Sequence, residues 1–540
     1  MIQRLLSYQK HWRLVALGIA AIVLMPLLVL FISWGTVQTE VWLHLIETQL
    51  GRLLGNTLVL LLGVGVGVTV LGVSLAWLTS MCEFPGRKWF DWALMLPFAV
   101  PAYVLAFVFI GLFDFSGPVQ SLLREWFGAA AWFPQVRSTG GVVLVLVLVF
   151  YPYVYMLARS AFVAQGRGLM DSARILGMGP WSSFWKVALP MARPAIAAGL
   201  ALALMETLAD FGAVATFNYD TFTTAIYKSW YGFFNLQAAA QLASLLLLFV
   251  AVALIVERRA RGKARFAEGE RRHVRQVYRL HGVLAWLASG YAGLIVLVAF
   301  VIPIVQLLVW IFTDALEDLD SRYLGLVTKT LTLGAIAAVM TVTTAVLLAY
   351  AQRLHRDRWV ASSVTIANLG YALPGSVLAV GIMVAFTWLD ATVTIPLQQW
   401  LGFEGRQLLM GSLLALIMAY GIRFLAVAFG PVESGLQRIR PSILESAQSL
   451  GEPPMGIVRR IYLPMLSPSL ITATLLVFVD VLKEMPATLL MRPFGWDTLA
   501  VRIFEMTSEG EWERAALPAF TLVLVGLIPV VLLMRRSASH

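Results

Sequence analysis

The stretch Glu445-Ser-Ala-Gln-Ser-Leu-Gly451, followed after nine residues by Ile461-Tyr-Leu-Pro464, decides the fold of this chain. It repeats an earlier stretch, Asp171-Ser-Ala-Arg-Ile-Leu-Gly177, which is followed after nine residues by Val187-Ala-Leu-Pro190. The copies lie about 274 residues apart, and each is a short polar segment between long apolar runs. Each copy therefore reads as a water-facing element of a membrane protein, and the duplication predicts a partner with two-fold symmetry.

The repeat extends well beyond these polar segments. Asn56-Thr-Leu-Val-Leu matches Lys329-Thr-Leu-Thr-Leu, and Leu96-Pro-Phe-Ala-Val-Pro101 matches Leu369-Gly-Tyr-Ala-Leu-Pro374 at nearly the same spacing. Chance similarity between apolar stretches would not keep this register, so the chain is a duplicated and fused module. The predicted domains are a first repeat, 1–257, with its polar loop at about 164–190; a basic linker, 258–281; and a second repeat, 282–540, with its loop at about 433–464.

Composition places the chain in a membrane. It is 59% hydrophobic and 13% charged, with a mean hydropathy of +0.81. Long apolar runs without strict alternation predict spanning helices rather than barrel strands. The fold class expected is therefore all-α: a polytopic membrane protein with about 12 transmembrane helices in two homologous six-helix halves. The runs are 14–34, 56–80, 90–113, 140–162, 192–215, 235–256, 283–312, 329–351, 362–388, 408–429, 466–490 and 516–534. No small-residue cleavage site follows the first run, so it is expected to be a retained helix.

The charge distribution predicts the orientation. If the N terminus is cytoplasmic, most Lys and Arg fall in cytoplasmic loops, so both termini are expected on that side. The net charge of +10 then favours contact with anionic membrane lipid, and nucleic-acid binding is the poorer interpretation. The densest basic cluster, Arg258–Arg279, is expected to be a solvated linker between the halves.

Several classes of chemistry have no motif in this sequence. Cys82 is the single cysteine, and with six scattered His it makes no zinc or iron–sulfur spacing, so no cofactor is predicted. No Gly-x-x-x-x-Gly-Lys-Ser/Thr phosphate loop occurs, so ATP hydrolysis would need a separate subunit and the chain is not expected to be an enzyme. The glycines of the first repeat are expected to form a helix-packing face: Gly63, Gly65, Gly67 and Gly72.

Each polar copy has the start and stop signals of two short helices joined by a turn. Gly177 and Gly451 suit the left-handed position that ends a helix, and a nearby proline suits the start of the next. Pro190 and Pro464 are expected to end that second helix. Small residues leave a low surface for a partner, and larger side chains are expected to anchor it: Trp181, Phe184, Trp185, Met455 and Ile457.

The duplicated pattern resembles the EAA loop of importer-type ABC transporter permeases, which reads Glu-Ala-Ala, three residues, Gly, nine residues, Ile-x-Leu-Pro. The resemblance covers about 50–257 and 323–534, and it implies a type I ABC importer-like fold. It also implies a bacterial inner-membrane protein that binds two copies of a cytoplasmic ABC ATPase and a periplasmic substrate-binding protein. In that family the loop is the coupling helix that docks on the ATPase. The role falls on Asp171, Ala173, Gly177 and Pro190, and on Glu445, Ala447, Gly451 and Pro464. Ser replaces the middle Ala in both copies, Asp171 replaces Glu, and Val187 replaces Ile.

Acidic residues follow each loop at matching places inside apolar runs, where charges are costly. Glu206 aligns with Asp480, and Asp210 with Glu484. The four-residue spacing is expected to put both acids on one face of each helix, where oxygen ligands would suit a hard cation. The alternative is structural: Lys483 pairs with a carboxylate, and the acids near helix ends form structural hydrogen bonds or contact the coupling loop. The metal ligands stay unknown at this stage.

The stretches Glu206-Thr-Leu-Ala-Asp-Phe-Gly-Ala-Val and Leu482-Lys-Glu-Met-Pro-Ala-Thr-Leu-Leu look like the fused iron(III) permeases of bacteria. This resemblance implies ferric iron, delivered by a periplasmic binding protein and moved by alternating access. Related fused permeases carry thiamine, and unfused relatives carry polyamines, sulfate or molybdate. An ion-coupled secondary transporter is a further alternative, although such carriers do not need a duplicated docking loop.

Overall fold

The computed structural model describes residues 2–36, 42–43, 45–128, 132–165, 175–261, 278–354 and 357–538. Nearly all of the described chain is helical, as the composition predicts; the described residues contain one two-stranded ladder, in which β1 (Cys82–Glu83) pairs in parallel with β2 (Tyr278–Arg279). Eleven described helices are long and apolar enough to cross a membrane. The last predicted run falls in α26 (Ala516–Ala538), whose described apolar part, Ala516–Ile528, is shorter.

The chain divides into two compact units. The first-half unit comprises 43–225, 246–318 and 503–540, and the second-half unit comprises 1–42, 226–245 and 319–502. Three helices are divided between them: α12 (Phe222–Tyr227), α13 (Leu236–Arg261) and α25 (Leu499–Ser508).

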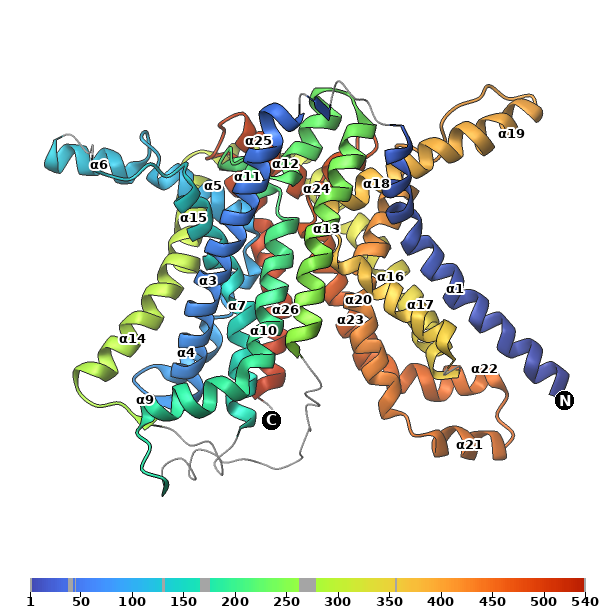
Figure 1. Cartoon of the computed structure of the whole chain (residues 1–540), viewed down its shortest axis with the longest axis horizontal. Helices are drawn as coiled ribbons and strands as arrows, with labels where there is room; N and C mark the ends of the chain where they lie inside the picture. The colour runs from blue at the N-terminus through green and yellow to red at the C-terminus, as the bar shows by residue number, and fades with distance from the viewer. Residues whose placement is uncertain are drawn as a thin grey trace. The chain divides into compact units, whose positions relative to one another are not determined.

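In the first-half unit, α3 (Gly51–Met81), α7 (Thr139–Ala164) and α10 (Leu189–Ala209) form the central packing (Figure 1). The predicted glycine face is confirmed: a Cβ on Gly67 would lie 2.4 Å from a methyl of Val147 on α7, so only glycine lets these backbones approach. Around this core lie α4 (Arg87–Ala93), η3 (Leu96–Ala99), α5 (Ala102–Phe113), α6 (Pro118–Phe127), α9 (Pro180–Ser183), η4 (Phe184–Ala188), α11 (Gly212–Thr216), α14 (Val283–Val296), η6 (Leu297–Val301), α15 (Ile302–Thr313), η7 (Ala315–Asp318) and α26.

In the second-half unit, α16 (Ser321–Leu354), α20 (Leu413–Arg438) and α23 (Leu463–Lys483) make the equivalent packing. Around them lie α1 (Ile2–Ile32), η1 (Ser33–Gly35), η5 (Lys228–Gly232), α17 (Arg358–Asn368), η8 (Leu369–Ala372), α18 (Gly375–Leu389), η9 (Asp390–Thr394), α19 (Ile395–Trp400), α21 (Pro441–Ser449), α22 (Pro454–Ile457), η10 (Val458–Tyr462) and α24 (Pro486–Met491).

Some helices of one repeat belong to the compact unit formed mainly by the other repeat. The N-terminal helix α1 packs on α16, α17 and α18, and a Cβ on Gly381 of α18 would lie 2.7 Å from the carbonyl oxygen of Pro26. Helices α14 and α15 pack in the first-half unit, where the Trp310 ring fills the space beside Gly111 of α5. Compact units and sequence repeats are thus different divisions of the chain, and the predicted repeat boundaries stay a prediction.

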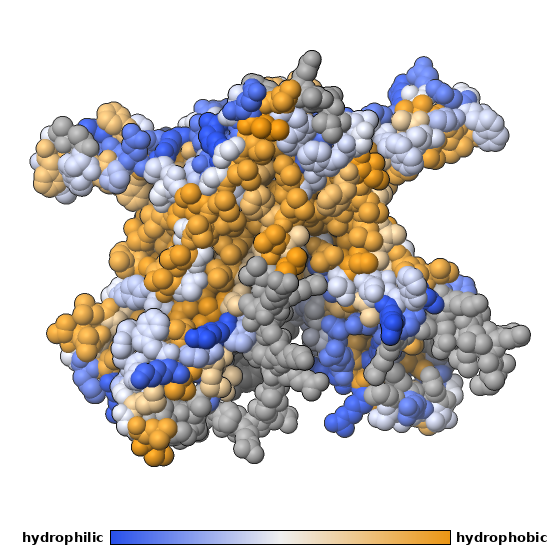
Figure 2. Space-filling model, in the orientation of Figure 1, coloured by the Kyte–Doolittle hydropathy of each residue, from blue (hydrophilic) through white to orange (hydrophobic). Residues whose placement is uncertain are grey.

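Asn56 and Lys329, which match each other in the two repeats, have the same structural task. Asn56 on α3 donates from Nδ2 to the carbonyl of Asp220 at 2.9 Å, and Lys329 on α16 donates from Nζ to the carbonyl of Gly495 at 2.7 Å. Each bond ties a long helix, α3 or α16, to the loop that follows the short helix α11 or α24. Away from these ends, hydrophobic residues such as Leu62 and Val66 face outward along α3, where lipid would surround them (Figure 2).

Candidate coupling loops and acidic helix ends

The second polar loop is a helix–turn–helix at the end of α20. Helix α21 begins at Pro441, and Gly451 has φ of +81° just beyond it, as its sequence predicts. Glu445 is exposed on α21, whereas Ala447 is buried. The side chain of Leu450, immediately before the glycine, is 84% exposed.

The first polar loop shares these features where it is described. Asp171 and Ala173 lie outside the described residues. Gly177 has φ of +75°, and the preceding Leu176 is 78% exposed, like its counterpart Leu450. Among the described residues, no atom lies within 4 Å of a Cβ placed on either loop glycine. Each loop therefore presents an exposed leucine followed by an uncrowded turn.

Two groups of expectations about the loops are wrong. Pro190 and Pro464 do not end a helix: each occupies the first turn of a transmembrane helix, α10 or α23, directly after the π-helical turns η4 and η10. Proline fits there because its missing N–H is not needed at a helix start. The π-helical turn before it has a wider hydrogen-bond spacing, so the chain can continue into the α-helix. Of the expected anchors, Phe184 and Ile457 are buried, and only Trp181 and Trp185 are exposed among those described.

A single arginine holds both ends of the second loop. Arg353 on α16 donates from Nη2 to the carbonyl of Ile439 at 2.6 Å and from Nη1 to the carbonyl of Leu436, where α20 ends. Its guanidinium lies 5.7 Å from the ring centroid of Tyr462, where the loop rejoins α23. We call this the Arg353 clamp.

The first loop is held by uncharged side chains instead. Gln165, at the end of α7, donates from Nε2 to the carbonyl of Ala188 at 3.0 Å. Beside it, the ring of Trp77 on α3 packs edge-on against Phe162 and Phe184, with centroids 5.5 and 4.9 Å apart. The two loops thus share a left-handed glycine where both are described, but they are fixed by different contacts, and no sequence motif marked either set of contacts.

The expectation that two acids share a face of each helix is also wrong. Helix α10 ends at Ala209 and α23 ends at Lys483, so Asp210 and Glu484 have extended backbones just past the helix ends. Each carboxylate caps the short helix that follows. Asp210 accepts the Val214 N–H at 3.1 Å, and Glu484 accepts the Ala487 N–H at 2.9 Å.

Glu484 also forms a buried ion pair. Its Oε2 lies 3.5 Å from Nη1 of Arg423 on α20, and the two side chains are 4% and 11% exposed. A Cβ on Gly375, at the start of α18, would clash with the Glu484 carboxylate, so this glycine makes room for the pair.

The other two acids remain within their helices. Glu206 on α10 and Asp480 on α23 are half-buried, and Asp480 is close enough to interact electrostatically with Lys483. Among the described residues, no group of three or more His, Cys, Asp or Glu is placed to hold a metal ion. The acids thus divide into two helix-capping residues and two candidates for contact with a solute.

Comparison with known proteins assigns the family. The sequence pattern of the binding-protein-dependent transport system inner membrane component matches residues 68–262 and 341–537, once in each repeat. The Fe(3+)-transport system permease protein FbpB 2 of Haemophilus influenzae is 27% identical over 91% of each chain. The molybdenum transport system permease protein ModB of Escherichia coli is 33% identical over 27% of this chain and 62% of its own. The sulfate transport system permease protein CysT of the same species is 33% identical over 27% and 50%.

Among solved structures, the crystal structure of a bacterial alginate ABC transporter matches 46% of this chain and 92% of its own, with 17% identity and a TM-score of 0.37. The family match covers most of both repeats and includes the described parts of both polar loops and all four acids. The chain therefore belongs to the family of binding-protein-dependent transport system inner membrane components, as a multi-pass permease with two repeats of the family unit in one polypeptide.

Proposed function

We propose that this chain is the transmembrane permease of an ATP-driven importer that moves ferric iron from a periplasmic binding protein into the cytoplasm. The observation that carries the proposal is the likeness to the Haemophilus iron permease, which extends over 91% of both chains and so spans both repeats. The molybdenum and sulfate permeases match over only about a quarter of this chain.

The two polar loops are the proposed docking sites for two copies of the ATPase. Each exposes a leucine beside a left-handed glycine, and an exposed apolar side chain of this kind suits a partner's groove. The first loop would add Asp171, Ala173 and the exposed Trp181 and Trp185. The second would add Glu445, with the buried Ala447 letting α21 pack closely on the rest of its loop.

The orientation follows from the same assignment. Docking of an intracellular ATPase puts both loops in the cytoplasm, and the excess of Lys and Arg in the loops on that side agrees with cytoplasmic N and C termini. The binding protein would then meet the opposite ends of the helices. Glu206 and Asp480 are the proposed contacts for a cation, because the carboxylates of Asp210 and Glu484 cap helices.

An anion substrate is the second candidate, favoured by the molybdenum and sulfate relatives. In the second-half unit the buried Arg423 is neutralised by Glu484, so it does not supply the net positive charge that an anion would need. Thiamine or a polyamine would also fit the permease architecture.

The test is reconstitution of the permease in proteoliposomes with its ATPase and, in turn, binding proteins loaded with ferric iron, molybdate, sulfate or thiamine. We expect ATP-dependent uptake of radioactive iron alone. ATP-dependent uptake of another solute in place of iron would overturn the substrate. Uptake driven by an ion gradient without the ATPase would overturn the assignment to importers altogether.

A further inference from the structure

Both units carry an amphipathic extension at the same place in the repeat. The first arm, residues 114–128, follows α5 and contains α6; the second arm, residues 390–411, follows α18 and contains η9 and α19. Each leads into the helix, α7 or α20, whose far end meets the coupling loop, so each arm lies at the end of its unit opposite that loop (Figure 1). The arms have no shared motif, but each contains a short helix that follows a spanning helix.

The second arm is folded around one carboxylate. Asp390 is fully buried, and it accepts the N–H groups of Leu408, Leu409 and Met410 at 3.2, 3.1 and 2.9 Å. Gln398 accepts the N–H of Arg406 at 3.0 Å and donates to its carbonyl at 2.8 Å. These bonds satisfy backbone groups of the loop internally and hold it in one shape.

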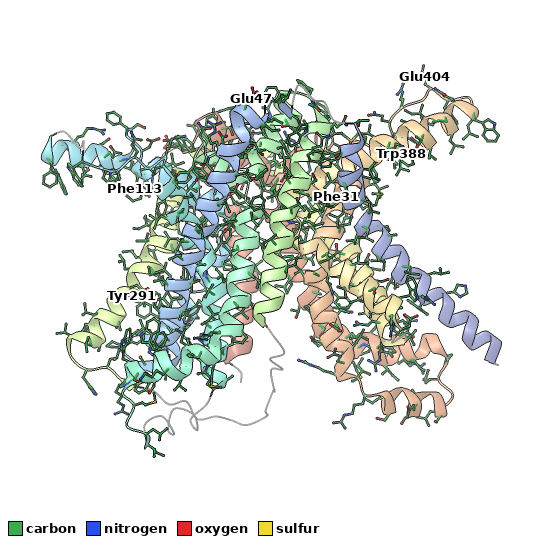
Figure 3. All side chains as sticks on the ribbon, in the orientation of Figure 1. Phe31, Glu47, Phe113, Tyr291, Trp388 and Glu404 are labelled. Carbon is green, nitrogen blue, oxygen red and sulfur yellow. The ribbon has the colours of Figure 1, made fainter. Side chains whose placement is uncertain are left out.

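The outer surface of the second arm is correspondingly apolar. Six large hydrophobic side chains are between 50% and 81% exposed: Val393, Leu397, Trp400, Leu401, Phe403 and Leu408. Two charged residues of the arm follow α19 and form an exposed ion pair, in which Arg406 Nη2 lies 3.0 Å from Glu404 Oε2. Figure 3 shows Glu404 at the far end of this arm and Trp388 at its root, on α18. In Figure 2 the most hydrophilic residues of the arm lie along its upper edge, and hydrophobic patches lie among weakly polar residues below them.

The first arm repeats this division on a helix. Its apolar residues recur at the spacing of one helical face, and Leu122, Trp126 and Phe127 are 45%, 67% and 68% exposed. Gln120 is buried at the root of the arm, where it donates from Nε2 to the carbonyl of Phe113 at 2.8 Å, near the end of α5. Phe113 is labelled at the root of this arm in Figure 3.

A lipid surface is the occupant that these observations fit. The arms continue α5 and α18, so their apolar side chains extend the hydrophobic surface of spanning helices. Trp and Phe on one face with charges on the other is the pattern of a helix lying in a membrane–water interface. We propose that both arms lie flat in the bilayer surface opposite the coupling loops, with their aromatic side chains in the lipid and their charged residues in water.

The natural chain suits a direct test because Cys82 is its single cysteine. In a Cys82→Ala background, Trp400→Cys and Trp126→Cys would carry an environment-sensitive fluorophore, with Glu404→Cys and Glu125→Cys as matched controls on the polar sides. The labelled full chain is placed in lipid nanodiscs. Quenching is then measured with a spin-labelled phospholipid and, separately, with iodide in the water.

We expect the phospholipid to quench the two tryptophan positions several-fold more than the glutamate positions, and iodide to give the reverse order. Equal access of iodide to all four positions would overturn the proposal. So would protection of the tryptophan positions only when a binding protein is added, because the arms would then be a protein-docking surface. If the Cys82→Ala chain does not fold, the natural background serves, because Cys82 is buried and burial raises the pKa of its thiol to about 11, which leaves it unreactive.

Discussion

At the residue scale, Gly177 and Gly451 separate the effect of docking from the effect of folding. Both have positive φ, and no described atom lies within 4 Å of a Cβ placed on either one, so a side chain there would strain the backbone by about 1–2 kcal/mol without its Cβ crowding the described part of the chain. A larger effect on transport would have to arise at the surface of a partner.

Replacing both glycines with leucine should therefore leave the permease in the membrane and reduce its co-purification with the ATPase at least tenfold. Gly510→Leu is the control, because Gly510 also has positive φ and nothing within 4 Å but is outside both loops. Normal ATPase binding by the Gly177→Leu, Gly451→Leu chain would contradict the docking assignment.

The Arg353 clamp gives a second prediction at this scale. Arg353→Met removes two charge-assisted bonds to the end of α20, at a cost of about 1–3 kcal/mol in stability, and frees the second loop to tilt. We expect ATP hydrolysis to continue with several-fold less solute moved per ATP. The Arg353→Lys variant cannot bridge both carbonyls in the same way, so it should recover only part of the normal amount of solute moved per ATP. An unchanged transport-to-hydrolysis ratio in Arg353→Met would show that the clamp only stabilises the helix.

The two kinds of residue differ in how far sequence could reveal them. Gly177 and Gly451 are helix stop signals inside a local motif, and their left-handed backbone was predictable from the sequence alone. Arg353 is 83 and 86 residues from the carbonyls that it bonds, and Gln165 bonds one 23 residues away. No local pattern encodes contacts of that range. The burial of Phe184 and Ile457 was hidden for the same reason, since an apolar residue beside a membrane surface can face either way.

At the scale of elements, α10 and α23 show where hydrophobic periodicity stops being informative. The apolar runs predicted both helices, but the runs continue past Ala209 and Lys483, where the helices end. The break is set by capping carboxylates and, in the second half, by Pro486 at the start of α24. The prediction that Asp210 shares a helical face with Glu206, and Glu484 with Asp480, was therefore wrong.

The buried pair in the second half should be sensitive to loss of one member. Glu484→Gln leaves the Arg423 guanidinium without its carboxylate, and we expect the free energy of unfolding to fall by about 3–5 kcal/mol, measured as thermal stability in detergent. Adding Arg423→Met should restore much of that loss. If the double variant is no more stable than Glu484→Gln, the carboxylate acts through its cap on α24 and not through the ion pair.

The half-buried acids should report on the solute instead. Glu206→Gln combined with Asp480→Asn keeps side-chain shape but removes two negative charges, so we expect iron uptake to be lost while expression and ATPase binding persist. Because Asp480 interacts with Lys483, the same pair is also compared in a Lys483→Met background. Iron uptake at the normal rate in both backgrounds would make these acids structural.

At the scale of the whole molecule, one chain holds both proposed docking loops, so it should bind two ATPase subunits. Native mass spectrometry of the purified complex should show one 59.5 kDa permease chain with two copies of the ATPase. Two permease chains in the complex would contradict this stoichiometry. The two loops are held by different contacts, so the two ATPase sites are expected to differ in affinity.

The repeat was visible in the sequence because matched motifs kept their spacing, and the family pattern falls on both halves. The exchange of α1, α14 and α15 between the compact units was not visible. These helices are long and apolar, and which core they join depends on fits such as Pro26 against Gly381 and Trp310 against Gly111. Such fits leave no periodic signal.

That exchange has a consequence for how the protein is made. Helix α1 leaves the ribosome first, but the helices on which it packs begin only at Ser321. At about 5–20 residues per second, roughly 15–60 seconds pass before α16 is even synthesised. During that interval the newborn N-terminal helix has lipid or an insertion factor as its neighbour, and the final arrangement of the second half cannot form until α1 is captured.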